Sequence, residues 1–191
     1  MLRNLAKKAL KRAAKKILNQ EPPSPTAVVP TKPPTPPVQS GPDDGIRFAS
    51  LNEIHEAISG PGKLRIVNHW ATWCDGCLEE LPLLVELRGA LASEVEFLGI
   101  SWDSFQGAMV GQDLIEEVRS HSRRHGISWD SLLVKAPPPE FFEHLGMTCN
   151  TIPQVWLVDK EGSVVHRIEQ VLEGEDVQRL ETHIKQLLGA S

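Results

Sequence analysis

The chain has 191 residues and a formal net charge of −5, a length that suits one folded domain with an additional segment. Residues 1–20 hold seven basic side chains and no acidic one, so the remainder carries 13 basic against 25 acidic residues. An acidic body argues against nucleic acid as a partner, because phosphate binding needs a basic surface. Three cysteines are too few for a disulfide framework. They fit a reducing compartment, or an oxidising one in which a cysteine pair is the working disulfide.

The N-terminal region divides into a predicted helix and a linker. Residues 1–18 place apolar side chains on one helical face and lysine or arginine on the other. This basic amphipathic helix (residues 1–20) predicts contact with an anionic membrane surface or an acidic partner, and a solvated tail is the alternative. Residues 21–45 are a Pro-rich linker, since nine of the 15 prolines lie within 22–42.

No transmembrane helix and no secretory signal peptide are recognised in the sequence. No run approaches 18 apolar residues, and lysine or arginine interrupts each short apolar run near the start of the chain. We therefore expect a cytoplasmic protein, placed at a membrane surface if the N-terminal helix binds lipid.

The rest of the chain, 46–191, is long enough to bury a core of its own. Its alternation of apolar runs with helical periodicity predicts an α/β domain whose central sheet is parallel first and ends in an antiparallel hairpin, with flanking helices. The expected helices are a short one after a capping box at Ser50 and Glu53, then 74–91, 112–125, 140–145 and 175–188. The expected strands are 64–70, 95–102, 131–134, 154–159 and 163–168.

The motif with the clearest chemistry is Cys74-Asp75-Gly76-Cys77, at the point where a strand gives way to a helix. Free backbone N–H groups and the helix dipole favour a thiolate there. The position predicts a thiol–disulfide redox site in which Cys74 attacks and Cys77 resolves the mixed disulfide. Half of a zinc site is the alternative. It needs two further ligands, and the sequence offers no second Cys-x-x-Cys or Cys/His cluster, so no metal is expected.

A longer pattern surrounds these cysteines. It reads Asn68-His69-Trp70-Ala71-Thr72-Trp73-Cys74-x-x-Cys77-x-x-Glu80-x-Pro82, with Thr151-Ile152-Pro153 ahead of a later strand. This pattern resembles the thioredoxin superfamily, and within it the TlpA/ResA-like thiol–disulfide oxidoreductases. The resemblance spans about 48–188, and it implies a thioredoxin-like fold and exchange of the Cys74/Cys77 dithiol with protein disulfides.

The resemblance also implies roles for four further residues. Pro153, if cis, would bring its loop against Cys74 and leave the backbone of Ile152 to pair with an extended substrate. Trp73 would shield the site and offer a flat contact surface. Glu80 would relay the proton of Cys77 and have a raised pKa. The alternatives are a strand-initiating proline, a core tryptophan and a solvated glutamate.

Three residues depart from the family pattern. Gly76 replaces a proline, and Asp75 puts a negative charge beside Cys74, which should raise the pKa of that thiol. His69 replaces a phenylalanine, and we expect a core histidine with a hydrogen-bond partner. A less stable thiolate makes the disulfide less oxidising. We therefore expect a reductant of protein disulfides that is recharged by an upstream dithiol and needs no cofactor. The alternative is a non-catalytic binding module tethered by its N-terminal helix.

Overall fold

The computed structural model describes residues 45–105, 109–135, 138–146 and 151–189. The predictions for the N-terminal helix and for the linker up to residue 44 lie outside these ranges. No helix in the described ranges is long and apolar enough to cross a membrane.

The described residues form one mixed sheet with flanking helices. The strands are β1 (Ile46–Ala49), β2 (Leu64–Trp70), β3 (Val95–Ser101), β4 (Asp130–Val134), β5 (Gln154–Val158) and β6 (Val164–Ile168). The helices are α2 (Leu51–Ser59), α3 (Asp75–Leu91), α4 (Gly111–His125), α5 (Pro138–Leu145) and α6 (Gly174–Gly189), with a short 3₁₀ turn η1 (Asp103–Phe105). Each predicted element is present, and its bounds agree with the prediction to within two residues.

The strand order in the sheet is β1-β4-β3-β2-β5-β6. Strands β1, β4, β3 and β2 run parallel to one another, whereas β5 is antiparallel to both β2 and β6. The predicted sheet, parallel first and antiparallel at its end, is confirmed. Strand β1 was not predicted. Its four residues are too short a run to show a periodicity, and the strand exists because it pairs with β4.

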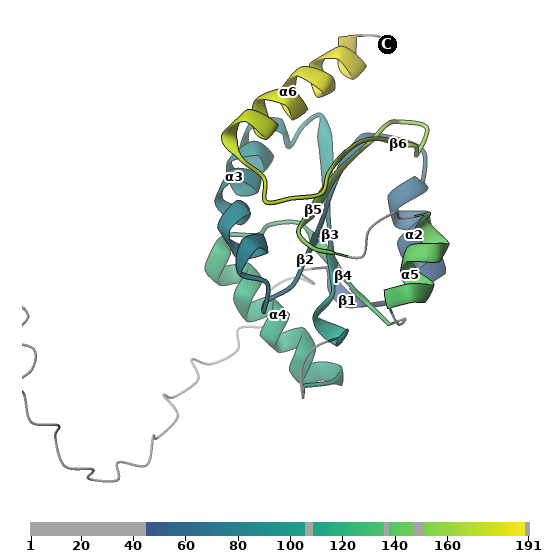
Figure 1. The fold of residues 1–191 in the computed structure, drawn as a ribbon, viewed down its shortest axis with the longest axis vertical. Helices are drawn as coiled ribbons and strands as arrows, with labels where there is room; N and C mark the ends of the chain where they lie inside the picture. The colour runs from purple at the N-terminus through teal and green to yellow at the C-terminus, as the bar shows by residue number, and fades with distance from the viewer. Residues whose placement is uncertain (1–44, 106–108, 136–137, 147–150, 190–191) are drawn as a thin grey trace, which may run out of the picture. The chain divides into compact units, whose positions relative to one another are not determined.

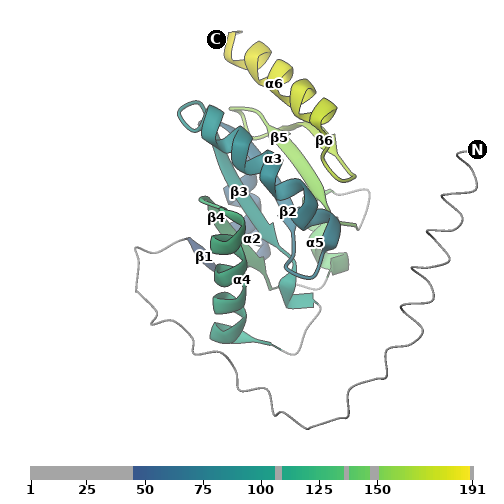
Figure 2. The ribbon, with the colours of Figure 1, turned by 90° about the vertical axis from the view of Figure 1, so that its left-hand side faces the viewer.

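The helices cover both faces of the sheet. Helices α3, α4 and α6 lie on one face and α2 and α5 on the other, as the two views of the ribbon show (Figures 1 and 2). Strand β2 lies in the middle of the sheet, so all seven of its residues are buried. The residues that follow β2 and β3 meet at one edge of the sheet, because the carboxyl ends of parallel strands lie together. The cysteine pair lies at this edge.

Candidate active site

Cys74 and Cys77 are joined by a disulfide at the N-terminus of α3, with their Cα atoms 5.2 Å apart. Cys74 is the N-cap residue of the helix, and its Sγ accepts a hydrogen bond of 3.2 Å from the Cys77 N–H. Cys74 is 9 % exposed, whereas Cys77 is fully buried. Cys77 Sγ lies 4.0 Å from the carbonyl oxygen of His69. The sulfur that solvent or a substrate can reach is therefore that of Cys74.

The turn between β2 and the cysteines is held by Asp103, which sequence reasoning missed. One carboxylate oxygen of Asp103 accepts hydrogen bonds from the Thr72 N–H at 2.9 Å and from Thr72 Oγ1 at 2.5 Å. The other oxygen accepts from Ser101 Oγ at 2.7 Å. Asp103 is 2 % exposed, and next to Thr72 the Trp73 side chain is 38 % exposed. An acidic residue placed two positions after the end of a buried strand, as Asp103 is after β3, was the signal that could have identified it.

The predicted loop at Pro153 lies against the cysteine turn. The Ile152–Pro153 peptide bond is cis, as the family resemblance implied. A Cβ atom added to Gly76 would lie 3.6 Å from Pro153 Cδ, so the proline ring and the Cys74–Cys77 turn are neighbours. Gln154 supports this loop, since its Nε2 donates to the Thr151 carbonyl at 2.7 Å and its Oε1 accepts from Trp156 Nε1 at 3.0 Å.

Glu80 is fully buried in α3, one turn beyond Cys77. Its Oε2 accepts a hydrogen bond of 2.9 Å from the Leu172 N–H, in the segment between β6 and α6. Its Oε1 has no hydrogen-bond partner among the described residues. Burial raises the pKa of the carboxyl to about 7, and the Leu172 N–H offsets part of that rise. The solvated alternative is wrong, and the carboxyl is one that can exchange a proton near neutral pH.

His69 is a core residue, but the predicted hydrogen-bond partner is wrong. Its side chain is fully buried, and neither ring nitrogen has a partner among the described residues. Aromatic rings surround it instead, with the Trp156 centroid at 4.2 Å, Phe141 at 6.0 Å and Trp102 at 6.1 Å. Burial, with the charge of Arg167 as a second cause, lowers the pKa of His69 to about 3. The imidazole therefore occupies an aromatic position as a neutral ring.

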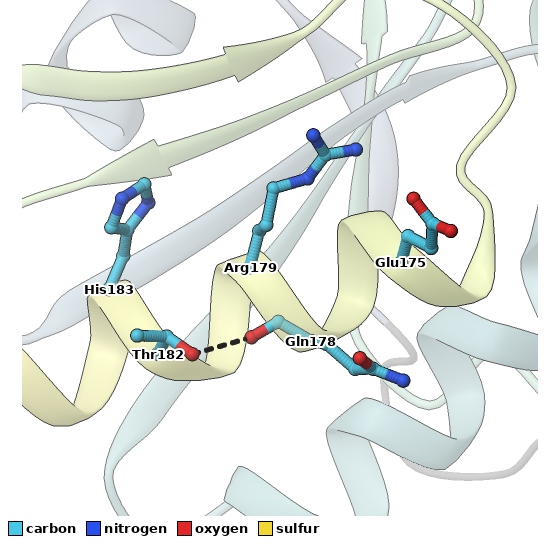
Figure 3. A pocket seen from close by; sticks show the side chains of 5 residues that line it. All are labelled: Glu175, Gln178, Arg179, Thr182 and His183. Atoms are coloured by element: carbon cyan, nitrogen blue, oxygen red, sulfur yellow. Dashed lines mark hydrogen bonds between the residues drawn. The ribbon is translucent and has the colours of Figure 1, made fainter.

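The described residues contain no group of three or more His, Cys, Asp or Glu side chains that could hold a metal ion. The described residues also line surface hollows away from the cysteines. One hollow of about 470 Å³ is lined, among the described residues, by Glu175, Gln178, Arg179, Thr182 and His183 of α6 (Figure 3). Neither Cys74 nor Cys77 lines it.

Known proteins resemble the chain across this site. The thiol:disulfide interchange protein HelX of Rhodobacter capsulatus is 28 % identical over 113 residues, which are 56 % of this chain and 52 % of HelX. The thiol-disulfide oxidoreductase ResA of Geobacillus kaustophilus is 26 % identical over 119 residues, 62 % of this chain and 61 % of ResA. The chain thus spans between half and two thirds of these relatives.

Solved structures agree with the fold. A thioredoxin-family thiol:disulfide interchange protein of Chlorobium tepidum matches with a TM-score of 0.51 and 26 % identity, over 69 % of this chain and 83 % of that one. Residues 43–167, about two thirds of the sequence, match the AhpC/TSA family. The chain therefore belongs to the AhpC/TSA family, with a thioredoxin-like fold.

Proposed function

We propose that the protein is a thiol–disulfide oxidoreductase that reduces disulfides in other proteins. One observation carries the proposal. The Cys74 sulfur lies at the start of α3, accepts the Cys77 N–H at 3.2 Å and is the more exposed of the two. A backbone N–H and a helix N-terminus both stabilise a thiolate, which is the form that attacks a disulfide.

The reaction begins from the reduced pair. The Cys74 thiolate attacks one sulfur of the substrate disulfide, so a mixed disulfide forms and the other substrate sulfur leaves as a thiolate that takes up a proton. Cys77 then loses its proton and attacks Cys74 Sγ. The Cys74–Cys77 disulfide forms, the second substrate sulfur is released, and two electrons have passed to the substrate. An upstream dithiol returns the pair to its reduced form by the same chemistry.

The surface beside Cys74 suits an extended substrate segment. Pro153 and Ile152 are half-buried next to the cysteine turn, and a substrate strand laid along this loop would pair with the backbone of Ile152. The exposed ring of Trp73 offers a flat apolar contact on the residue before Cys74. We assign substrate binding to Trp73, Ile152 and Pro153.

Glu80 is the group we propose for moving the proton of Cys77. A general base works best when its pKa is close to the working pH, and burial brings the pKa of Glu80 to about 7. The Asn68 amide offers no such group, because it does not titrate and its Oδ1 already accepts from Trp129 Nε1 at 3.0 Å. Glu80 Oε1 has no hydrogen-bond partner among the described residues, so it does not bond Cys77 directly. Proton transfer between Glu80 and Cys77 needs a small movement or a bridging water.

The direction we propose is reduction of the substrate. Asp75 opens α3 beside Cys74, and its negative charge opposes formation of the Cys74 thiolate. A dithiol that ionises less readily gives a disulfide that is less oxidising.

We place the protein in the cytoplasm, since three cysteines without a disulfide framework suit a reducing compartment. Residues 1–18 would hold it to an anionic membrane surface or an acidic partner. Sedimentation with anionic liposomes, with and without residues 1–20, tests this attachment.

The function is tested by insulin reduction and by trapping. The reduced full-length protein should accelerate insulin reduction by dithiothreitol, and Cys77→Ala should accumulate a mixed disulfide on Cys74 because the resolving thiol is gone. Cys74→Ala is the matched control and should trap nothing. If the wild type shows no turnover and Cys77→Ala traps no partner, the oxidoreductase proposal fails and the non-catalytic binding module takes its place.

A further inference from the structure

The segment between β6 and α6 is fixed to helix α3 by Glu80. The Leu172 N–H donates to Glu80 Oε2 at 2.9 Å, although the two residues are 92 positions apart in the sequence. The Leu172 side chain is 2 % exposed and belongs to the core under α3 and α6. This bond and this packing hold the neighbouring residue, Val171, at the same place relative to α3.

Val171 occupies the space that a side chain at position 76 would need. A Cβ atom added to Gly76 would lie 2.9 Å from Val171 Cγ2, closer than carbon atoms approach in packed proteins. The same Cβ would lie 3.6 Å from Pro153 Cδ, so Val171 and Pro153 flank one spot beside the cysteine turn. Val171 is half-buried, so part of it faces outward. The glycine that departs from the family pattern is therefore matched to a valine far along the chain.

We propose that Val171 is a specificity-determining residue of the redox site, and that Glu80 is the residue that positions it. The inference rests on the proposed function. A substrate segment laid along Pro153 meets the Val171 side chain where it passes Gly76. The space there is already filled, so a bulky substrate side chain cannot enter. The preferred substrates are protein disulfides whose attacked cysteine is flanked by small residues.

The two roles given to Glu80 can be separated by two substitutions. Glu80→Gln keeps an oxygen that accepts the Leu172 N–H but removes the titrating proton. Glu80→Ala removes both and releases the segment that carries Val171. A purely proton-transferring Glu80 predicts the same substrate preference in both variants. A positioning Glu80 predicts that the preference survives in the glutamine variant and is lost in the alanine variant.

The experiment compares two disulfide-linked peptides that differ only in the two residues flanking the attacked cysteine, both glycine in one peptide and both phenylalanine in the other. The readout is the ratio of their kcat/KM values for reduction by the full-length protein, with dithiothreitol as the regenerating dithiol. We expect the wild type to prefer the glycine peptide by about tenfold, the lower range for steric discrimination by an apolar pocket. Val171→Ala and Glu80→Ala should bring the ratio close to one. Glu80→Gln should keep it, and so should Val165→Ala, a control on an exposed valine of β6.

A second measurement tests the steric match independently of substrate. Gly76→Ala should lower the Tm, and the double variant Gly76→Ala/Val171→Ala should recover most of that loss. The inference is overturned if Val171→Ala leaves the peptide ratio unchanged, or if the double variant melts no higher than Gly76→Ala. It is also overturned if Glu80→Gln loses the preference as fully as Glu80→Ala. Failure of the wild type to reduce either peptide overturns the proposed function instead, and the substrate preference falls with it.

Discussion

Two buried groups, His69 and Glu80, should cancel one another in the pH dependence of stability. Burial lowers the pKa of His69 from 6.5 to about 3 and raises that of Glu80 from 4.5 to about 7. Between pH 4.5 and 6.5 the unfolded chain binds a proton at His69 that the folded protein does not. Over the same range the folded protein keeps a proton at Glu80 that the unfolded chain has lost. The two contributions to proton uptake therefore have opposite signs, and their effects on the free energy of unfolding nearly cancel.

Removing either titrating group should reveal how the other makes the free energy of unfolding depend on pH. In Glu80→Gln the contribution of His69 is no longer offset, so relative to the wild type the free energy of unfolding should fall as the pH falls from 6.5 to 4.5. In His69→Phe the contribution of Glu80 is no longer offset, so relative to the wild type the free energy of unfolding should rise as the pH falls over the same range. One proton per molecule gives about 1.4 kcal/mol per pH unit, and each group is only partly titrated at one end of the window. Each variant should therefore change by about 2 kcal/mol relative to the wild type between pH 4.5 and 6.5, in opposite directions. Repacking costs shift a whole curve but not its slope, so they do not obscure the result.

The assay is urea unfolding of the full-length protein in its disulfide form, at half-unit pH steps, followed by tryptophan fluorescence. His55→Gln is the matched control, because it removes one imidazole from the exposed side of α2. If Glu80→Gln and His69→Phe both run parallel to the wild type from pH 4.5 to 6.5, the buried neutral histidine and the protonated buried glutamate are both refuted.

Three further predictions concern the redox site. The kcat/KM for disulfide reduction should show an inflection near pH 7 that Glu80→Gln removes, as stopped-flow kinetics would show; an unchanged profile would exclude Glu80 as the titrating group. Asp103→Ala should lower the free energy of unfolding, measured by urea titration, by about 2–3 kcal/mol, because it leaves the Thr72 N–H without its carboxylate acceptor. Asp113→Ala, at an exposed position, is the control and should change the free energy of unfolding little. Asp75→Asn should raise the reduction potential by on the order of 10–20 mV in a glutathione titration, and a lower potential would contradict the argument from charge.

The parts of the fold that could be predicted are those encoded over short stretches of sequence. The capping box is one example, since Ser50 and Glu53 lie three residues apart and exchange the expected hydrogen bonds. The redox pair is another, because a Cys-x-x-Cys after a buried strand already places a sulfur at a helix N-terminus. The cis bond before Pro153 was predicted differently, through family resemblance, because no local rule distinguishes it from an ordinary trans proline.

The parts that could not be predicted depend on partners far along the chain. Strand β1 exists through its pairing with β4, more than 80 residues later. His69 was expected to have a hydrogen bond, but the three aromatic rings around it come from other elements of the fold and offer it none among the described residues. Asp103 was passed over, because its role depends on β2 and β3 ending at the same edge of the sheet.

The sequence by itself determined the chemistry at Cys74 and Cys77, because helix ends and residue spacing act within one or two turns of the chain. The tertiary structure decided what surrounds that chemistry. Burial within the folded domain, rather than its helical position, raises the pKa of Glu80. The tertiary structure also explains why glycine replaces the family's proline at position 76. Val171, almost a hundred residues away in the sequence, fills the space beside Gly76. Packing and desolvation depend on neighbours in space, so only the folded chain could supply them.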